Sequence, residues 1–232
     1  MPLRKWFESA NYAIEGVLHA AKTERHLRYH FYAASAVLIL SFLLGVSRAE
    51  FLLISIMAVI VICAELLNTA IEHVVDLLSP EKNELARLAK DIAAGAVLVT
   101  AFGSLVIGYI ILAPYIYRAF QEGFTIAKHT GEDTAVVSLV IVLILVIITK
   151  SHFGLGRPLR GGLPSGHSAL AFSIWVSTTY ISQNYIVSIL TFVAALVIAQ
   201  SRVAVKAHTA WEVILGGLLG SITTFVLFLI FY

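Results

Sequence analysis

Two groups of polar residues interrupt an otherwise apolar sequence, and the first is a stripe of acids. Glu65, Asn68, Glu72 and Asp76 recur at helical spacing at the end of a long apolar run, so they share one face of a helix. Three carboxylates on one face repel each other unless a cation lies among them, and a divalent metal carrying a nucleotide is the simplest such cation. Glu24, an acid within a basic segment, could supply a second carboxylate to that metal. The alternative is a set of residues that only satisfy one another between packed helices, although ionisable groups in membrane segments are by default functional.

The second group gathers cations and histidines at the ends of apolar helices. It consists of Lys150, Arg157, Ser165, Gly166, His167, Arg202, His208 and Glu212. Three cations neutralise a phosphate, and a helix that starts after Ser165 offers free N–H groups to an anion. His208 and Glu212 are four residues apart, so the carboxylate can orient the imidazole and leave its other nitrogen nucleophilic, while His167 can protonate a leaving alkoxide. Taken singly, these residues have structural explanations as flanking charges or turn formers, but together they predict a phosphate site.

Composition places both groups in a membrane protein. Of the 232 residues, 59% are hydrophobic and only 13% are charged, and the mean hydropathy is +0.89, which is typical of a chain that crosses a membrane several times. The net charge of +2 carries little information, and we expect no nucleic-acid partner. The lone Cys63 lies in an apolar run, so we interpret it as a small core residue and expect no disulfide. We also expect no removable signal peptide.

The hydropathy pattern predicts an all-α protein with one surface helix and about seven membrane helices. Residues 3–21 have helical periodicity with charged residues outside the apolar set, which predicts an amphipathic helix on the membrane surface. The predicted membrane helices are 31–46, 51–78, 92–116, 135–149, 168–181, 186–200 and 209–232. Polar residues interrupt the pattern at 114–134, which we interpret as a connector between two domains, 1–113 and 135–232.

The first domain carries a specific motif. Glu65-x-x-Asn68-Thr-Ala-Ile-Glu72-x-x-Val75-Asp76 is followed by Ala89-Lys90-Asp91, and together they resemble the signature of the small prokaryotic integral-membrane diacylglycerol kinases and undecaprenol kinases. The resemblance covers residues 1–113 and implies an ATP- and Mg²⁺-dependent lipid kinase that works as a homotrimer with sites shared between subunits. Phosphoryl transfer needs charge neutralisation and one placed base, and it does not need a Gly-rich loop. The lipid could be undecaprenol or diacylglycerol.

The resemblance also implies a role for each matching residue. Glu65 would be the base that takes the proton from the lipid hydroxyl. Glu24 and Glu72 would hold the Mg²⁺ of MgATP, and Asn68 would support that constellation. The residues implied to contact the nucleotide are Tyr12, Glu81, Asn83, Lys90 and Asp91.

The second domain, over residues 135–232, resembles the type 2 phosphatidic acid phosphatase superfamily. The three motifs are Lys150-x6-Arg157-Pro158, Pro164-Ser165-Gly166-His167 and Ser201-Arg202-x5-His208-x3-Glu212. The resemblance implies a phosphatase that needs no metal, in which His208 attacks phosphorus, His167 is the general acid and Glu212 orients His208. The residues that would hold the phosphoryl oxygens are Lys150, Arg157, Ser165, Gly166 and Arg202. This chain departs from the family in having Glu212 where Asp is usual, and four helices where six are usual; the missing helices could come from the kinase domain or a neighbouring subunit.

We therefore predict a bifunctional lipid enzyme of the bacterial inner membrane, a lipid kinase fused to a lipid-phosphate phosphatase. The alternative is a kinase whose second half binds lipid phosphate without hydrolysing it, as a sensor or scaffold. A small transporter is disfavoured, because the charges cluster at helix ends. With seven crossings and a cytoplasmic N-terminus, thirteen Lys and Arg residues fall on the cytoplasmic side and three outside, as the positive-inside rule requires. This topology predicts that both active sites face the cytoplasm.

Overall fold

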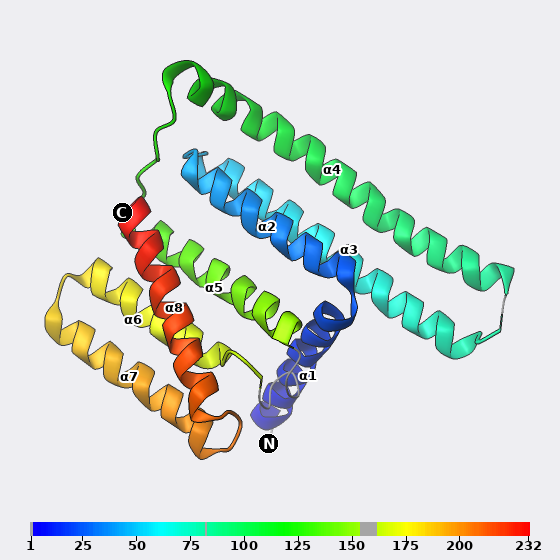
Figure 1. Cartoon of the computed structure of the whole chain (residues 1–232). Helices are drawn as coiled ribbons and strands as arrows, with labels where there is room; N and C mark the ends of the chain where they lie inside the picture. Colours follow the sequence, from blue (N-terminus) through cyan, green and yellow to red (C-terminus); the bar gives the residue numbers. More distant parts are fainter. Residues whose placement is uncertain (1, 82, 154–161) are drawn as a thin grey trace. The chain divides into compact units, whose positions relative to one another are not determined.

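The computed structural model describes residues 2–81, 83–153 and 162–232, and these residues form eight α-helices and no strand (Figure 1). The prediction of an all-α protein is confirmed. The chain divides into two compact units. One unit is Thr23–Ala127, and the other combines the first helix with Lys128–Tyr232.

Three long helices make up the unit Thr23–Ala127. They are α2 (Arg25–Leu43), α3 (Arg48–Leu78) and α4 (Glu84–Glu122), and α3 packs against both of the others (Figure 1). α3 begins with a capping box, in which Ser47 Oγ accepts a hydrogen bond from the Glu50 N–H and the Glu50 carboxylate accepts one from the Ser47 N–H at 2.9 Å. Such a box satisfies N–H groups that the start of a helix leaves unpaired, so the local sequence determines where α3 begins.

Helix α4 is longer at both ends than the predicted helix 92–116. At its start the Asn83 side chain accepts hydrogen bonds from the N–H groups of Leu85 and Ala86, at 2.9 and 3.4 Å, and so caps the helix. At its other end α4 continues past Pro114 to Glu122. Proline removes one backbone hydrogen bond, but membrane helices tolerate it. The predicted end of this helix at 116 is therefore wrong.

Four helices form the main part of the other unit. They are α5 (Gly131–Phe153), α6 (Gly166–Ser182), α7 (Tyr185–Ala204) and α8 (Ala210–Phe231), and their ends agree with the predicted helices to within four residues. α6 packs against α5, α7 and α8, and α8 also contacts each of the other three helices (Figure 1). The apolar contact between α5 and α6 includes Val142, Val146 and Ala169.

Two glycines allow α6 and α8 to approach closely. A Cβ atom at Gly216 would lie 2.3 Å from the carbonyl oxygen of Ser165, and one at Gly220 would lie 1.9 Å from that of Ala169. Both distances are too short for any side chain. Gly216 and Gly220 form a Gly-x3-Gly motif, which is common where membrane helices pack closely. In the structure it holds the start of α6 against α8.

The first helix, α1, spans Pro2–Thr23, close to the predicted 3–21. Leu18, Ala20 and Ala21 are buried, whereas Tyr12 is 70% exposed. Burial in α1 is therefore concentrated in its last turns, among the side chains that the structure describes.

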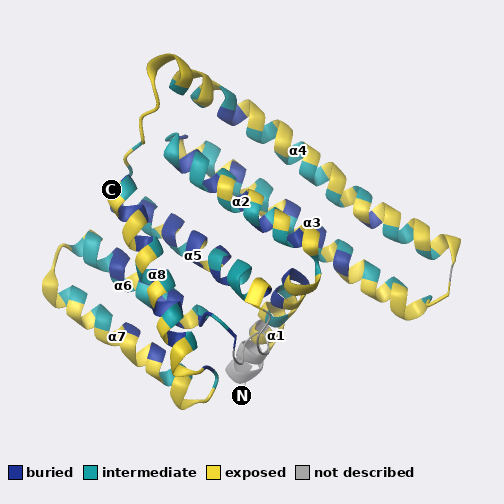
Figure 2. Ribbon diagram, in the orientation of Figure 1, coloured by how far each residue is buried: buried dark blue, intermediate teal, exposed yellow. Residues whose placement is uncertain are grey.

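Five helices of the described chain are long and apolar enough to cross a membrane, namely α3, α4, α5, α7 and α8. Large apolar side chains remain exposed along them (Figure 2), as expected of helices that face lipid. The prediction of a multi-pass membrane protein is confirmed. The count of seven crossings stays a prediction, because α6 has only 17 residues and α2 opens with a basic segment at 25–30.

Candidate functional site

The histidine predicted to be a nucleophile lies in the short segment between α7 and α8. The His208 side chain is only 3% exposed, and its Nδ1 lies 2.7 Å from Glu212 Oε2. The backbone N–H of His208 donates to the carbonyl oxygen of Arg202 at 3.2 Å, which holds the segment in place. Because Nδ1 is engaged by the carboxylate, Nε2 is the ring nitrogen left for chemistry.

Glu212 contacts more than the histidine. Its backbone N–H donates to Thr209 Oγ1 at 3.3 Å, and its Oε2 also accepts from the Thr209 N–H at 3.2 Å, so the two residues form a capping box at the start of α8. Its second oxygen, Oε1, accepts from the Gly162 N–H at 2.9 Å, and its carbonyl oxygen accepts from the Ser165 N–H at 2.9 Å. One residue thus joins the segment before α6 to the start of α8.

Positive charges act on His208. Lys150, in the last turn of α5, and Arg202, in the last turn of α7, both interact electrostatically with its imidazole. Burial is the main cause that lowers the pKa of His208 below its ordinary value of 6.5; the hydrogen bond with Glu212 opposes this shift, and the two cations add to it. The imidazole therefore stays neutral to lower pH, and only a neutral imidazole has a free electron pair with which it could act as a nucleophile.

The start of α6 is tightly packed. Ser165 is fully buried and is the N-cap residue of α6, as predicted. Its hydroxyl does not cap the helix, however, but accepts a hydrogen bond from Ser168 Oγ at 3.3 Å. Gly166 is the first residue of α6, and a Cβ atom there would lie 3.2 Å from a Val146 methyl group. Little space is left at this position for a side chain.

The predicted general acid shares this surrounding. His167, in the first turn of α6, is an electrostatic neighbour of His208, Lys150 and Arg202. The structure therefore brings together both histidines, two cations and the carboxylate of the second group. Arg157 lies outside the described residues.

The acidic stripe of the first half lies on α3. Glu65 is buried and Glu72 is half-buried, whereas Asp76 is exposed. The Asn68 side-chain amide donates to Glu72 Oε1 at 2.8 Å, and Asn68 Oδ1 is buried without a hydrogen-bond partner among the described residues. A buried amide oxygen costs free energy unless it accepts a hydrogen bond, so Asn68 Oδ1 is suited to accept from a ligand or from another chain.

Ion pairs engage two of the residues predicted to contact a nucleotide. Lys90 forms an ion pair with Asp76 and so links α4 to the end of the acidic stripe. Asp91 accepts from Arg87 at 2.9 Å within α4. Such exposed pairs contribute little to stability, so a charged ligand can replace either partner at small cost.

The remaining residues predicted for the first half are more dispersed. Glu24 precedes α2 and is half-buried, Glu81 is exposed after α3, and Asn83 is the cap of α4. Tyr12 lies on α1, which belongs to the other unit. Among the described residues, no group of three or more His, Cys, Asp or Glu side chains could hold a metal. Mg²⁺ is usually bound by one or two carboxylates together with water and substrate phosphates, so Glu24 and Glu72 are a chemically sufficient protein contribution.

Two family models match the chain. The model described as prokaryotic diacylglycerol kinase matches residues 11–112, and the model of the PAP2 superfamily matches residues 98–232. The first half is 45% identical over 112 residues to the undecaprenol kinase of Bacillus subtilis, in an alignment that covers 48% of this chain and 91% of the relative. The chain belongs to both families.

Diacylglycerol kinases are also similar to the kinase part. The protein of Synechocystis is 38% identical over 122 residues, which cover 49% of this chain and 70% of the relative. The diacylglycerol kinase of Haemophilus influenzae is 34% identical over 91 residues, which cover 39% of this chain and 77% of the relative. No solved structure matches the chain. The predicted resemblance to both families is confirmed.

The two family matches overlap at residues 98–112, within α4. The PAP2 match therefore begins before residue 135, where the motifs suggested that the resemblance starts. It includes the second part of α4 in addition to α5 through α8. The PAP2 part thus extends over a fifth helix, which the kinase match shares.

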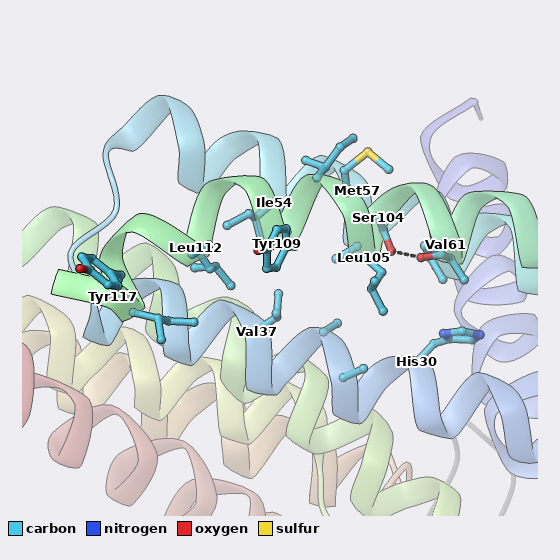
Figure 3. Close-up of a pocket in the computed structure, with 18 of the residues that line it drawn as sticks. His30, Val37, Ile54, Met57, Val61, Ser104, Leu105, Tyr109, Leu112 and Tyr117 are labelled. Carbon is cyan, nitrogen blue, oxygen red and sulfur yellow. Dashed lines mark hydrogen bonds between the residues drawn. The ribbon is translucent and has the colours of Figure 1, made fainter. Parts of the chain in front are cut away.

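The kinase part has an apolar groove lined by α2, α3 and α4, with a volume of about 890 Å³ (Figure 3). This volume is within the range of ligand sites. His30 lies at one end of the groove and Tyr117 at the other, and Val61 and Ser104 lie near the His30 end. Because Val61 precedes Glu65 by one helical turn, this end of the groove is close to the buried carboxylate. Sequence reasoning missed the groove.

Sequence reasoning also missed two residues of the PAP2 site. Thr209-x-x-Glu212 has the spacing of a capping box, so the role of Thr209 could have been found in the sequence. The contact of Gly162 with Glu212 could not, because it depends on how segments 50 residues apart meet in the fold.

Proposed function

We propose that the chain is a bifunctional membrane lipid enzyme, which uses ATP to phosphorylate a lipid alcohol and removes phosphate from a phosphorylated lipid. The observation that supports the phosphatase most directly is the hydrogen bond between the buried His208 and the half-buried Glu212, 2.7 Å long, within the PAP2 match. The kinase is supported by the similarity to relatives named undecaprenol kinase and diacylglycerol kinase. The proposed domains are 1–113 for the kinase and 135–232 for the phosphatase, with 114–134 as the connector.

In the kinase part, Glu65 would take the proton of the lipid hydroxyl. The hydroxyl oxygen would attack the terminal phosphorus of ATP, and ADP would leave. Burial on α3, one turn from the apolar groove, suits this role. Proton transfer to a correctly positioned base typically increases the reaction rate by about 10²–10⁴-fold. Glu24 and Glu72, with Asn68, would hold Mg²⁺, which when bound neutralises charge on the phosphates.

The nucleotide would contact five residues, of which Lys90 pairs with Asp76 at the end of the acidic stripe. They are Lys90, Asp91, Tyr12, Glu81 and Asn83. The Lys90 ammonium would exchange Asp76 for a phosphate oxygen, and because that pair is partly exposed the exchange costs little free energy. In this way the chain would supply the positive charge that phosphoryl transfer needs.

In the phosphatase part, His208 Nε2 would attack phosphorus, and the bond from phosphorus to the lipid oxygen would break. His167 would give its proton to the leaving oxygen and then take one from the water that hydrolyses the phosphohistidine. Glu212 would stabilise the positive charge that His208 acquires. The groups that would hold the phosphoryl oxygens are Lys150, Arg157, Ser165, Gly166 and Arg202. This half needs no metal in the proposal.

The apolar groove suits the hydrocarbon part of a lipid alcohol, because its walls are almost entirely apolar side chains from three membrane helices. With the hydrocarbon in the groove, the hydroxyl would lie toward Glu65. The identity is higher to the relative named undecaprenol kinase (45%) than to the one named diacylglycerol kinase (38%), which favours a polyprenol over diacylglycerol. Opposed activities on one lipid would only consume ATP, so we expect different substrates or regulation.

We further propose that the chain is a homotrimer in the bacterial inner membrane with both sites on the cytoplasmic face. The positive-inside bias supports this topology. Single cysteines at Lys128 and Val205, both exposed, in a Cys63→Ala background test it with a membrane-impermeant maleimide on intact cells. Labelling of the Lys128 position alone is expected; labelling of the Val205 position alone would put the phosphatase outside.

The decisive experiment uses the purified full chain, γ-labelled ATP and a panel of lipid alcohols and lipid phosphates. Formation of labelled lipid measures the kinase, and release of inorganic phosphate in the presence of a chelator measures the phosphatase. The second candidate is a kinase whose PAP2 part only binds lipid phosphate. Binding of phosphorylated lipids without any phosphate release, across the whole panel, would favour that candidate.

A further inference from the structure

The two carboxylate oxygens of Glu212 contact different parts of the chain. Oε2 pairs with His208 Nδ1 at 2.7 Å and with the Thr209 N–H at 3.2 Å, which are both next to α8. Oε1 accepts from the Gly162 N–H at 2.9 Å, in the segment that leads into α6. Orienting a nucleophile requires only the first oxygen, so the mechanism proposed above leaves the Gly162 contact unexplained.

A second bond joins the same two segments. The Ser165 N–H donates to the Glu212 carbonyl oxygen at 2.9 Å, and Gly216, one turn further along α8, leaves room for the Ser165 carbonyl, which a Cβ atom would meet at 2.3 Å. The segment from Gly162 to Ser165 is therefore attached to α8 at both of its ends. This segment directly precedes Gly166 and His167.

The backbone at Gly162 is adapted to this contact. Its φ is +93°, a conformation that residues with a side chain rarely adopt. Gly162 is also buried, so its N–H would be left without a partner if the carboxylate oxygen were withdrawn, and an unpaired buried N–H is costly.

The length of Glu212 matters here. Aspartate is shorter by one carbon–carbon bond, about 1.5 Å, and its carboxylate would start from the same backbone position. We propose that Glu212 is a clamp: its length lets one carboxylate orient His208 and at the same time hold Gly162, so that the phosphate-binding segment is fixed relative to the nucleophile. Gly162 is then a positioning residue, and the replacement of the usual Asp by Glu has a mechanical purpose. This inference rests on the proposed phosphatase.

If Glu212 is a clamp, Glu212→Asp should mainly weaken phosphate binding, whereas Glu212→Gln should mainly change the pH profile of activity. Aspartate keeps the charge beside His208 but gives up Gly162, so binding of inorganic phosphate should weaken about tenfold or more, as expected for a lost hydrogen bond to a charged group. In Glu212→Asp the fall of kcat/KM at acidic pH, the acid limb of the pH profile, should keep its wild-type midpoint. Glutamine keeps the length and an acceptor oxygen for Gly162 but loses the charge, so phosphate binding should change less than in Glu212→Asp, while the acid limb moves.

The test uses full-length protein and measures inorganic phosphate binding by calorimetry and kcat/KM as a function of pH. Glu132→Asp, at an exposed glutamate in the first turn of α5, is the matched control and should bind phosphate as the wild type does. Kinase activity and helical content of the same preparations report folding. Wild-type phosphate affinity in a folded Glu212→Asp variant, or equal weakening in both Glu212 variants, would overturn the clamp. If the wild type binds phosphate but releases none from lipids, the phosphatase proposal fails, while the binding comparison still tests the clamp.

Discussion

The two halves of the molecule differ in how complete their sites are within one chain. In the PAP2 part, hydrogen bonds of Glu212 join His208 to the segment before α6. The most apolar stretch of α5 and of α8 is 39% buried, although that of α7 is only 11% buried. In the kinase part, α3 and α4 have 17% and 11% buried, and Asn68 Oδ1 has no partner among the described residues. Membrane helices with so much free surface pack against lipid or further helices. We therefore propose that the phosphatase site forms within one chain, and that a neighbouring chain contributes to the kinase site, as in a homotrimer.

The largest effect is expected from removing the nucleophile. His208→Ala should reduce phosphate release by about 10⁴-fold or more, because no other group can form the covalent intermediate. The measurement is phosphate release from the preferred lipid phosphate. His129→Ala, a histidine of the same unit outside the site, is the control. Kinase activity should be unchanged, since the two sites use separate residues; measurable turnover by the alanine variant would exclude His208 as the nucleophile.

The kinase should be lost separately. Glu65→Gln removes the base but keeps its size, and should reduce lipid phosphorylation by about 10²–10⁴-fold while phosphate release remains. Labelled lipid formed from γ-labelled ATP is the readout, with Glu122→Gln, at the exposed end of α4, as the control. Kinase activity within about threefold of wild type would remove Glu65 from this role.

Mixing variants tests the difference between the halves directly. If Glu24 and Glu65 of one kinase site come from different chains, co-expression of Glu24→Gln and Glu65→Gln chains should restore lipid phosphorylation well above either variant alone. Co-expression of His208→Ala and Glu212→Gln chains should restore no phosphate release beyond that of Glu212→Gln, because these residues are bonded within one chain. Failure of the kinase pair to complement would show that Glu24 and Glu65 of one kinase site belong to the same chain.

The sequence predicted the parts of the fold that depend on local chemistry. Most helices, the N-cap position of Ser165 and the pairing of His208 with Glu212 follow from spacing and hydropathy. It misjudged α4, because the polar residues after 114 indicated a connector, whereas the helix continues through Pro114 to Glu122. The side chain of Asn83 caps α4, and its contact with a nucleotide stays a prediction.

Contacts between distant segments could not be predicted in the same way. The bond from Gly162 to Glu212 and the fit of Gly220 against Ala169 depend on which face of α8 meets α6, and neither partner is identifiable from its neighbours in the sequence. The kinase residues show the same limit more strongly. Glu24 and Glu72 are far apart in the sequence, so their spacing alone cannot predict whether the fold brings the two carboxylates together.

The smallest effect is expected on the pH dependence of phosphate release. In the proposed mechanism His208 attacks as neutral imidazole. Burial lowers its pKa below 6.5, so the neutral form persists to more acidic pH than for an ordinary histidine. The acid limb of kcat/KM should therefore have its midpoint below pH 6.5. This limb reports free enzyme and free substrate, and a lipid phosphomonoester also titrates near pH 6, so the wild-type profile alone does not isolate His208.

Two variants whose acid-limb midpoints should shift in opposite directions do isolate the contribution of His208, because the substrate is the same in both. Glu212→Gln removes the carboxylate that raises the pKa of His208, so the midpoint should move to lower pH; Lys150→Gln removes a cation that lowers it, so the midpoint should move to higher pH. Each shift should be about one unit or less, on top of a reduced plateau. Glu132→Gln, outside the site, should leave the midpoint in place. Shifts of both variants in the same direction would mean that the limb belongs to another group, and that the charges around His208 do not control its protonation.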